Sequence, residues 1–184
     1  MTRHSQTEIA VLGALSVEPM TGYAVRAAIT ETLGDFWSES FGQIYPTLGR
    51  LEAVGHVRRA TTGKTSGSKF EITESGLARL RDLLAEPIDV LPPRNGLLLR
   101  LFFGHLLGPA VCAQLIGDAL DRAEAAASTY AAVRAEILAD PHNPHAPYWL
   151  ITVTAGERAA AAQVEWARDA LALLPPEAAS ARER

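Results

Sequence analysis

The chain has 184 residues, 48% of them hydrophobic and 21% charged, with a formal net charge of −4 at pH 7, which is ordinary for a globular protein. Its longest apolar run, residues 97–107, is interrupted by Arg100, Gly104 and His105, so we expect no membrane-spanning helix. The N-terminal sequence MTRHSQTEIA lacks the pattern of a secretory signal, and the single cysteine, Cys112, excludes an internal disulfide. These features favour a cytoplasmic location, with Cys112 as a small buried residue of a helix.

The acidic net charge argues weakly against nucleic-acid binding, but the distribution of charge matters more than its sum. Between Glu52 and Glu71 the sequence has no acidic residue. Four basic residues fall in this window: Arg58, Arg59, Lys64 and Lys69. The window therefore predicts a local basic patch.

A first helix is predicted over residues 5–15. Ser5 and Glu8 have the spacing of a capping box, in which the two side chains satisfy backbone N–H groups of the first turn. Apolar residues follow at helical spacing until Pro19 breaks the pattern.

A second helix is predicted after Thr21, which can cap its start, and Gly34 can close it. Gly22, just inside this helix, would allow another backbone to approach closely, because glycine has no Cβ. Together with the next predicted helix, these elements fit a helix-turn-helix arrangement.

The third predicted helix lies within residues 36–55 and is the candidate for a helix that enters the major groove of DNA. Ser40 is a suitable N-cap, with Gln43 three residues later as in a capping box. Gly55 is expected to end the helix. Four residues at spacings of three and four predict one apolar stripe: Ile44, Leu48, Leu51 and Val54.

The opposite face of this helix carries Gln43, Thr47 and Arg50, with Tyr45 beside them. These side chains can form hydrogen bonds with phosphates or base edges. Pro46 lies too deep to be a first-position proline, so we expect either a later start or a bend there. The alternative is an amphipathic helix that is simply half-buried.

After the third helix the pattern changes to two short strands, residues 57–62 and 68–73, joined by the turn GKTSG. Apolar and polar residues alternate in the second strand, so one of its faces can pack on the helices. A basic hairpin in this place is typical of the wing of a winged helix, where Lys64 and Lys69 would position the protein on the DNA backbone. The alternative is a surface hairpin that is basic by chance.

A fourth helix is predicted from Glu74 to Ala85, capped by Thr73. Residues 87–95, PIDVLPPRN, contain three prolines and are predicted to link two domains.

Several short motifs follow one another over residues 1–85: Gly22-Tyr23, Ile44-Tyr45-Pro46-Thr47-Leu48, Arg50-Leu51-Glu52 with Gly55, and Thr73-Glu74-Ser75-Gly76. In this order they resemble the PadR family of bacterial transcriptional regulators. The resemblance implies a winged-helix repressor that binds a palindromic operator as a dimer. Carried over by position, it implies DNA contacts from Ser40, Gln43, Tyr45, Thr47, Arg50, Lys64, Ser66, Ser68 and Lys69.

The chain departs from the family pattern at Gly49, where the family often has a larger and frequently basic residue. A glycine inside a helix costs up to about 1 kcal/mol and offers no phosphate contact.

The second half of the chain is predicted to be helical. Pro109 opens a long, Ala-rich helix, and after the loop DPHNPHAP a final helix runs from about Tyr148 to Leu174. Before them an apolar helix is expected over residues 96–107, with Leu97, Leu98, Leu101, Phe102 and Leu106 buried together.

Two long amphipathic helices and one very apolar helix cannot easily bury all their apolar faces in a monomer, so we expect a homodimer through them. A dimer would also let two recognition helices meet half-sites roughly 34 Å apart on DNA. The aromatic residues of this half either pack in the core and interface or line a pocket for a small aromatic effector, which the family resemblance makes credible. The candidate effector residues are Phe102, Phe103, Trp149 and Trp166.

No phosphate-binding glycine loop, GxSxG motif or paired carboxylates stand out, so we expect neither an enzyme nor a cofactor. His142 and His145, separated by a proline and without a third ligand nearby, are expected in an exposed loop rather than at a metal.

The sequence thus predicts a mainly α fold with an N-terminal winged helix-turn-helix domain, residues 1–86, that carries a two-stranded β wing. A linker, residues 87–95, an all-α dimerisation domain, residues 96–175, and a disordered tail, residues 176–184, would follow. The predicted function is sequence-specific DNA binding by a homodimeric repressor. The alternative is a winged-helix protein–protein adaptor without DNA binding, which the net acidity and Gly49 favour and the basic window disfavours.

Overall fold

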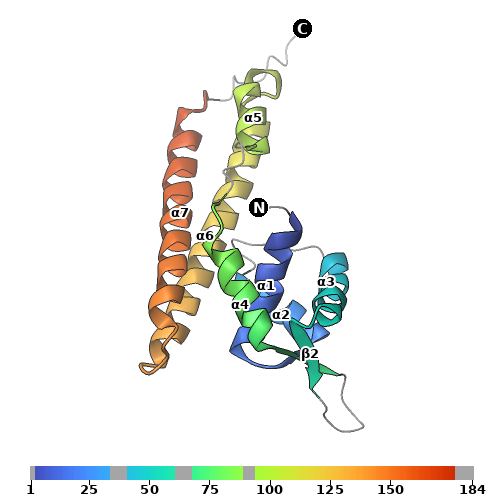
Figure 1. Cartoon of the computed structure of the whole chain (residues 1–184). Coiled ribbons are helices and arrows are strands. Elements are labelled where there is room, and N and C mark those ends of the chain that lie inside the picture. The colour runs from blue at the N-terminus through green and yellow to red at the C-terminus, as the bar shows by residue number, and fades with distance from the viewer. Residues whose placement is uncertain (1–2, 34–40, 61–67, 89–93, 177–184) are drawn as a thin grey trace. The chain divides into compact units, whose positions relative to one another are not determined.

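The computed structural model describes residues 3–33, 41–60, 68–88 and 94–176 (Figure 1). The chain divides into two compact units, residues 1–91 and residues 92–184. None of the described helices combines the length and the hydropathy that crossing a membrane requires.

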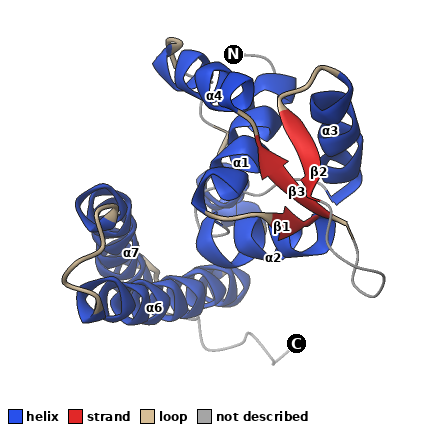
Figure 2. Cartoon of the chain, turned by 60° about the horizontal axis from the view of Figure 1, so that its bottom comes forward, coloured by secondary structure: helices blue, strands red, loops and turns tan. Residues whose placement is uncertain are grey.

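Among its described residues, the first unit has four helices and a small antiparallel sheet; Figure 2 shows their arrangement. The helices are α1 (Arg3–Val17), α2 (Gly22–Leu33), α3 (Phe41–Ala53) and α4 (Glu74–Ala85). The strands are β1 (Met20–Thr21), β2 (Val57–Ala60) and β3 (Lys69–Ile72), in the order β1-β3-β2. The prediction of a winged helix is confirmed, with α1 in contact with all three other helices and with β3.

The sheet has one strand more than the two-stranded wing that we expected. Met20 pairs with Phe70 and Thr21 with Lys69, so the segment that follows Pro19 adds a short third strand to the hairpin. Two residues are too few for an alternating pattern, which is why the sequence did not reveal this strand. The added strand ties the start of α2 to the first half of β3.

The start of α1 differs from the prediction. The helix begins at Arg3, so Ser5 lies within its first turn and not before the helix as we expected. The start of α2 is as predicted, because the Thr21 hydroxyl oxygen accepts a hydrogen bond from the Ala24 N–H at 3.1 Å. Gly34 lies outside the described residues.

Most of the predicted apolar stripe of α3 is in the core. Ile44, Leu48 and Leu51 are each 1% exposed, whereas Val54 is 59% exposed and does not belong to the stripe. The helix ends at a Schellman turn, in which the His56 N–H reaches the Leu51 carbonyl at 2.9 Å. Gly55 takes a φ of 77°, which glycine adopts without strain, so the predicted stop is confirmed.

This turn is also where α4 is attached. The Thr73 hydroxyl donates to the Gly55 carbonyl at 2.7 Å and accepts from the Gly76 N–H at 3.1 Å, which confirms Thr73 as the cap of α4. A Cβ at Gly76 would collide with the carbonyl oxygen of His56, so only glycine allows this approach. On α4, Leu80 and Leu83 are buried, whereas Leu84 is exposed.

The second unit contains α5 (Gly96–Phe102), a 3-10 turn η1 (Gly104–Leu106), and the long helices α6 (Pro109–Ala139) and α7 (Ala146–Leu173). The helices α6 and α7 pack along each other as a hairpin (Figure 1). The single apolar helix predicted over residues 96–107 is wrong, because the chain breaks at Phe103 and turns again at Gly108, with a φ of 83°.

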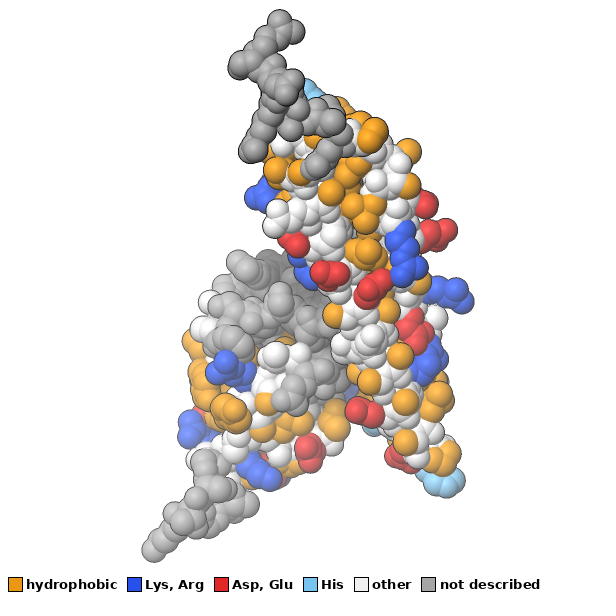
Figure 3. Space-filling view, turned by 180° about the vertical axis from the view of Figure 1, so that it is seen from behind, with side chains coloured by type: hydrophobic (Ala, Val, Ile, Leu, Met, Phe, Trp, Pro, Cys, Tyr) orange, Lys and Arg blue, Asp and Glu red, His pale blue; other side chains and the backbone are white. Residues whose placement is uncertain are grey.

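The expectation that the apolar residues of α5 are buried together is also wrong for the chain alone. No residue of α5 is buried, and Phe102 is 80% exposed and Leu106 76%. Leu97 and Leu101 are half-buried, and Leu98 is exposed. Figure 3 shows hydrophobic side chains on the surface at this end of the helical unit.

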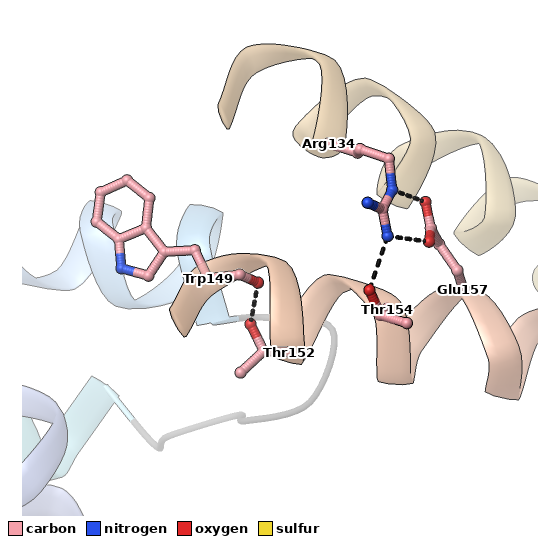
Figure 4. Close-up of polar contacts among 5 residues, drawn as sticks. All are labelled: Arg134, Trp149, Thr152, Thr154 and Glu157. Carbon is pink, nitrogen blue, oxygen red and sulfur yellow. Dashed lines mark hydrogen bonds and ion pairs between the residues drawn. The ribbon is translucent and has the colours of Figure 1, made fainter. Parts of the chain in front are cut away.

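Polar contacts fix the register of α6 against α7 (Figure 4). The Arg134 guanidinium donates to the Glu157 carboxylate at 2.7 Å and to the Thr154 hydroxyl at 2.8 Å. Hydrogen bonding by Arg134, with a smaller contribution from its charge, lowers the pKa of Glu157. Nearby, the Tyr130 ring lies against Gly156 where any Cβ would collide with it, so this glycine is needed for the close packing of the two helices.

We expect Thr73→Ala to lower the free energy of unfolding by about 1 kcal/mol, because it removes an N-cap and a hydrogen bond to the preceding turn. Urea unfolding of the full chain, followed by circular dichroism, measures this loss. Thr73→Ser keeps the hydroxyl and should remain close to the natural protein. An equal loss in both variants would contradict the capping role.

Candidate functional site

The buried and exposed faces of α3 decide which of its side chains another molecule can reach. Thr47 is 1% exposed and lies in the buried stripe with Ile44 and Leu48, so the prediction that it faces a DNA groove is wrong. Gln43 and Tyr45 are exposed, Tyr45 by 56%. The polar surface of α3 is therefore narrower than the sequence suggested.

The outermost ridge of α3 carries no polar side chain. Gly42, Pro46, Gly49 and Ala53 are all exposed and are spaced by four, three and four residues, which places them on one line along the helix. Gln43 and Arg50 lie on one flank of this ridge, and Tyr45 lies on the other. Because the ridge is bare, a partner surface can come close to the helix backbone, and polar contacts have to come from the flanks.

Pro46 does not delay the start of α3. The helix starts at Phe41, so the prediction of a later start is wrong, and Pro46 lies inside the helix. The Gly42 carbonyl loses the hydrogen bond that an N–H at position 46 would donate. Both residues are on the exposed ridge, where water can replace this bond.

Tyr45 is held by the start of α2. A Cβ at Gly22 would lie 2.6 Å from Cε1 of the Tyr45 ring, so the ring lies directly over this glycine. We expected Gly22 to allow the approach of a backbone, and it is an aromatic side chain that takes this space. The contact leaves Tyr45 half exposed but fixes its ring beside the ridge.

The arginines of the basic window are paired. Arg58 forms an ion pair with Glu71 at 2.8 Å, and Arg59 forms one with Glu52 at 2.8 Å. The hydrogen bonds that Arg59 donates to Glu52, followed by the charge of Glu52, raise the pKa of Arg59. Its guanidinium also lies 5.2 Å above the ring of Phe70. The two acids that bound the window thus neutralise its arginines, and the patch is less basic than predicted.

The other predicted wing residues divide into two groups. Ser68 and Lys69 are exposed, at the start of β3. Lys64, Ser66 and the predicted N-cap Ser40 lie outside the described residues.

Arg50, the arginine of α3, is also paired with a carboxylate. Arg50 donates to the Glu8 carboxylate at 3.1 Å, and Arg79 of α4 donates to the other oxygen of that carboxylate at 3.2 Å. The sequence did not reveal this cluster, because its three members come from three different helices.

The four aromatic residues proposed for an effector site do not gather in one place. Phe102 and Trp166 line an apolar groove of about 770 Å³ in the second unit. Phe103 packs edge-on against Phe102, with ring centroids 5.1 Å apart, but does not line the groove. Trp149 stacks on His145 in the first turn of α7, roughly 25 Å along the helix from Trp166. The prediction of a single pocket with all four aromatics is therefore wrong.

Other, mostly apolar residues form the rest of the groove. Cys112 is buried, as predicted, and its thiol donates to the Gly104 carbonyl at 3.5 Å. The absence of a Cβ at Gly104 makes room for this sulfur atom. Other lining residues are Leu98, Leu101, Pro109, Ile116, Leu173 and Leu174.

Side chains of the α6–α7 loop accept hydrogen bonds from the backbone of its two histidines. The backbone N–H groups of His142 and His145 donate to the side chains of Asp140 and Asn143. Within the part of the chain that the structure describes, no group of three side chains could hold a metal ion.

A winged helix with an exposed third helix and a β hairpin is the fold of a large class of DNA-binding regulators. The sequence profile of the Transcriptional regulator PadR-like family matches residues 11–82, and that of the Virulence activator alpha C-term family matches residues 93–175. The chain is 28% identical to the negative transcriptional regulator PadR of Bacillus subtilis, over 90% of this chain and 95% of that protein.

Solved structures of B. subtilis PadR agree over nearly the whole chain. The complex with operator DNA has a TM-score of 0.76 and 26% identity, with 91% of this chain and 98% of the other covered. The complex with p-coumaric acid has a TM-score of 0.72 and 25% identity, with 90% and 96% covered. These matches support a transcriptional regulator of the PadR family.

The bare ridge of α3 leads to a test at Gly49. A Cβ at this position meets no atom within 4 Å, so Gly49→Ala should raise the free energy of unfolding, by up to about 1 kcal/mol. We expect the same variant to bind DNA more weakly, because the added methyl group would separate the ridge from the major groove of DNA.

Gly13→Ala in α1 is the matched control, since its Cβ is equally unobstructed. It should stabilise the fold without weakening DNA binding, and both effects are measured by urea unfolding and by fluorescence anisotropy with labelled DNA. If Gly49→Ala binds DNA as tightly as the natural protein does, the ridge does not enter a groove of DNA.

Proposed function

We propose that the chain is a repressor that binds a palindromic operator as a homodimer and is released by a small aromatic ligand. In this proposal the first unit binds DNA and the second unit forms the dimer. Each α3 would lie in the major groove of one half-site, with half-sites roughly 34 Å apart, and each β2–β3 hairpin would lie along the backbone. The protein would act in the cytoplasm, where a bacterial chromosome is accessible.

The observation that carries the proposal is the exposed face of α3. Gln43 and Tyr45 stand beside a ridge without side-chain bulk, and Tyr45 is fixed by its contact with Gly22. An ordered ring and an amide on either side of a bare ridge suit a helix that reads base edges from its flanks. The similarity to B. subtilis PadR, a negative regulator whose complex with operator DNA has been solved, supports this role.

The exposed apolar residues of the second unit support a homodimer. Phe102, Leu106 and Leu173 are 80%, 76% and 84% exposed, and they lie at the same end of the helical hairpin. A contiguous apolar surface of this kind is typical of an interface. A symmetric dimer would cover it with the same surface of a second chain.

The ligand part of the proposal rests on the groove beside Phe102 and Trp166. Its volume of about 770 Å³ and its largely apolar lining suit a small planar molecule. The complex of B. subtilis PadR with p-coumaric acid supports a ligand of the same chemical class, a small aromatic acid. Such a ligand would release DNA only if it binds one conformation of the dimer better than the other.

The alternative function is a winged-helix adaptor that binds a protein. The pairing of Arg50, Arg58 and Arg59 with carboxylates favours it, because it lowers the positive potential of the first unit. Salt-sensitive and sequence-selective DNA binding would distinguish the repressor from the adaptor.

The repressor proposal is tested by titrating labelled DNA from upstream of the protein's own gene, with an unrelated duplex as control, at two salt concentrations. We expect selective binding to the upstream DNA that weakens as salt rises. Tyr45→Ala should cost roughly 1–3 kcal/mol of operator binding, whereas Tyr45→Phe keeps the ring over Gly22 and reports the hydroxyl alone. Equal and weak binding to both duplexes, and to a selected random library, would favour the adaptor.

The dimer is tested by Phe102→Glu, which places a charge on the exposed apolar surface. We expect the variant to be a monomer with unchanged helix content, measured by light scattering and circular dichroism, because the charge would be buried in the interface. Phe102→Leu keeps the apolar contact and should remain a dimer. A dimeric Phe102→Glu variant would move the interface elsewhere.

A further inference from the structure

Glu8 of α1 is shared by two arginines from different helices. Its Oε1 lies 3.1 Å from Arg50 of α3, and its Oε2 lies 3.2 Å from Arg79 of α4. Every other carboxylate in the ion pairs of the described residues has one arginine partner. The Glu8 side chain is only 15% exposed, whereas those of Arg50 and Arg79 are 42% and 38% exposed.

Arg50 is the only basic residue in the sequence of α3. It stands on the polar flank of the bare ridge, next to the surface where DNA is proposed to bind. A guanidinium has five N–H donors, so Arg50 has the chemistry to contact a phosphate. In the free protein its charge is instead balanced by Glu8.

We propose that Glu8 is a specificity-determining residue, which holds the Arg50 guanidinium at α1 and so withholds it from the phosphates of nonspecific DNA. The inference rests on the proposed DNA-binding function. An exposed arginine pairs with a carboxylate or a phosphate with similar, small energies. Arg50 pairs with the Glu8 carboxylate rather than with a phosphate, because Glu8 is already adjacent to it and because the charge of Glu8 repels an approaching phosphate.

Arg79 makes this arrangement reversible. In an operator complex, other contacts would hold a DNA group in place next to Arg50. When Arg50 turns to that group, Glu8 keeps its ion pair with Arg79 through its second oxygen. The largely buried carboxylate is therefore not left without a cation, which would be costly. Nonspecific DNA lacks those other contacts, so Arg50 stays with Glu8.

The test compares the full-length protein with Glu8→Gln on a random-sequence duplex about 30 base pairs long, roughly three helical turns. Affinity is measured by fluorescence anisotropy over a range of salt concentrations. We expect Glu8→Gln to bind about two- to fivefold more tightly at low salt. The slope of log affinity against log salt should become steeper by about 0.9, as expected for one more phosphate contact.

Two further variants separate the release of Arg50 from other effects. Glu74→Gln makes the same charge change at an exposed residue that belongs to none of the ion pairs among described residues, and it should leave the slope unchanged. Arg50→Gln removes the arginine concerned, so adding Glu8→Gln to it should give no gain in affinity or slope. Melting temperatures of all variants report whether the fold is kept.

The possible outcomes are distinct. A steeper slope that disappears in the Arg50→Gln background supports the proposal. Weaker binding by a folded Glu8→Gln variant would mean that Glu8 orients Arg50 toward DNA, and a gain that persists without Arg50 would assign the effect to Arg79; each overturns the proposal. If the natural protein binds neither this duplex nor its upstream DNA, the proposed function itself fails.

Discussion

The turn at Gly55 and His56 is the junction on which the first unit depends. It ends α3 and begins β2, and the hydroxyls of Thr73 and Ser75 donate to the Gly55 carbonyl at 2.7 and 3.0 Å. The His56 carbonyl lies against Gly76, where no side chain could fit. Because one turn binds the end of α3, the hairpin and the start of α4, the helix and hairpin that would meet DNA are oriented together. A shift in any of the three would break these hydrogen bonds.

Charge in the first unit is organised by local pairing. Glu8, Glu52 and Glu71 each take at least one arginine, which leaves Lys69 as an exposed cation of the described hairpin without a carboxylate at hydrogen-bonding distance. Such pairs add little to stability because they are exposed. Their larger effect is on the electric field at the surface, since a paired arginine attracts phosphate less than a free one. A protein with this pattern would bind DNA more through complementary shape and contacts with base edges than through attraction between its charges and the phosphates.

The second unit differs from the first, because large apolar residues of its surface remain exposed in the single chain. The helices α6 and α7 bury small residues such as Ala119, Ala160 and Ala167 between them, which brings their backbones close. Larger residues of α5 and of the end of α7 lie around the groove next to Trp166. A dimer partner and a small ligand would compete for, or share, this surface.

The sequence by itself determined the elements whose signals are local. The cap at Thr73, the stop at Gly55, the apolar stripe of α3 and the long helix after Pro109 all depend on neighbours within one or two turns. Only the tertiary structure decided the burial of Thr47, the third strand at Met20 and the ion pair of Arg50 with Glu8. Each of these results from contacts between segments far apart in the chain, and periodicity within one segment carries no information about which partner it will meet.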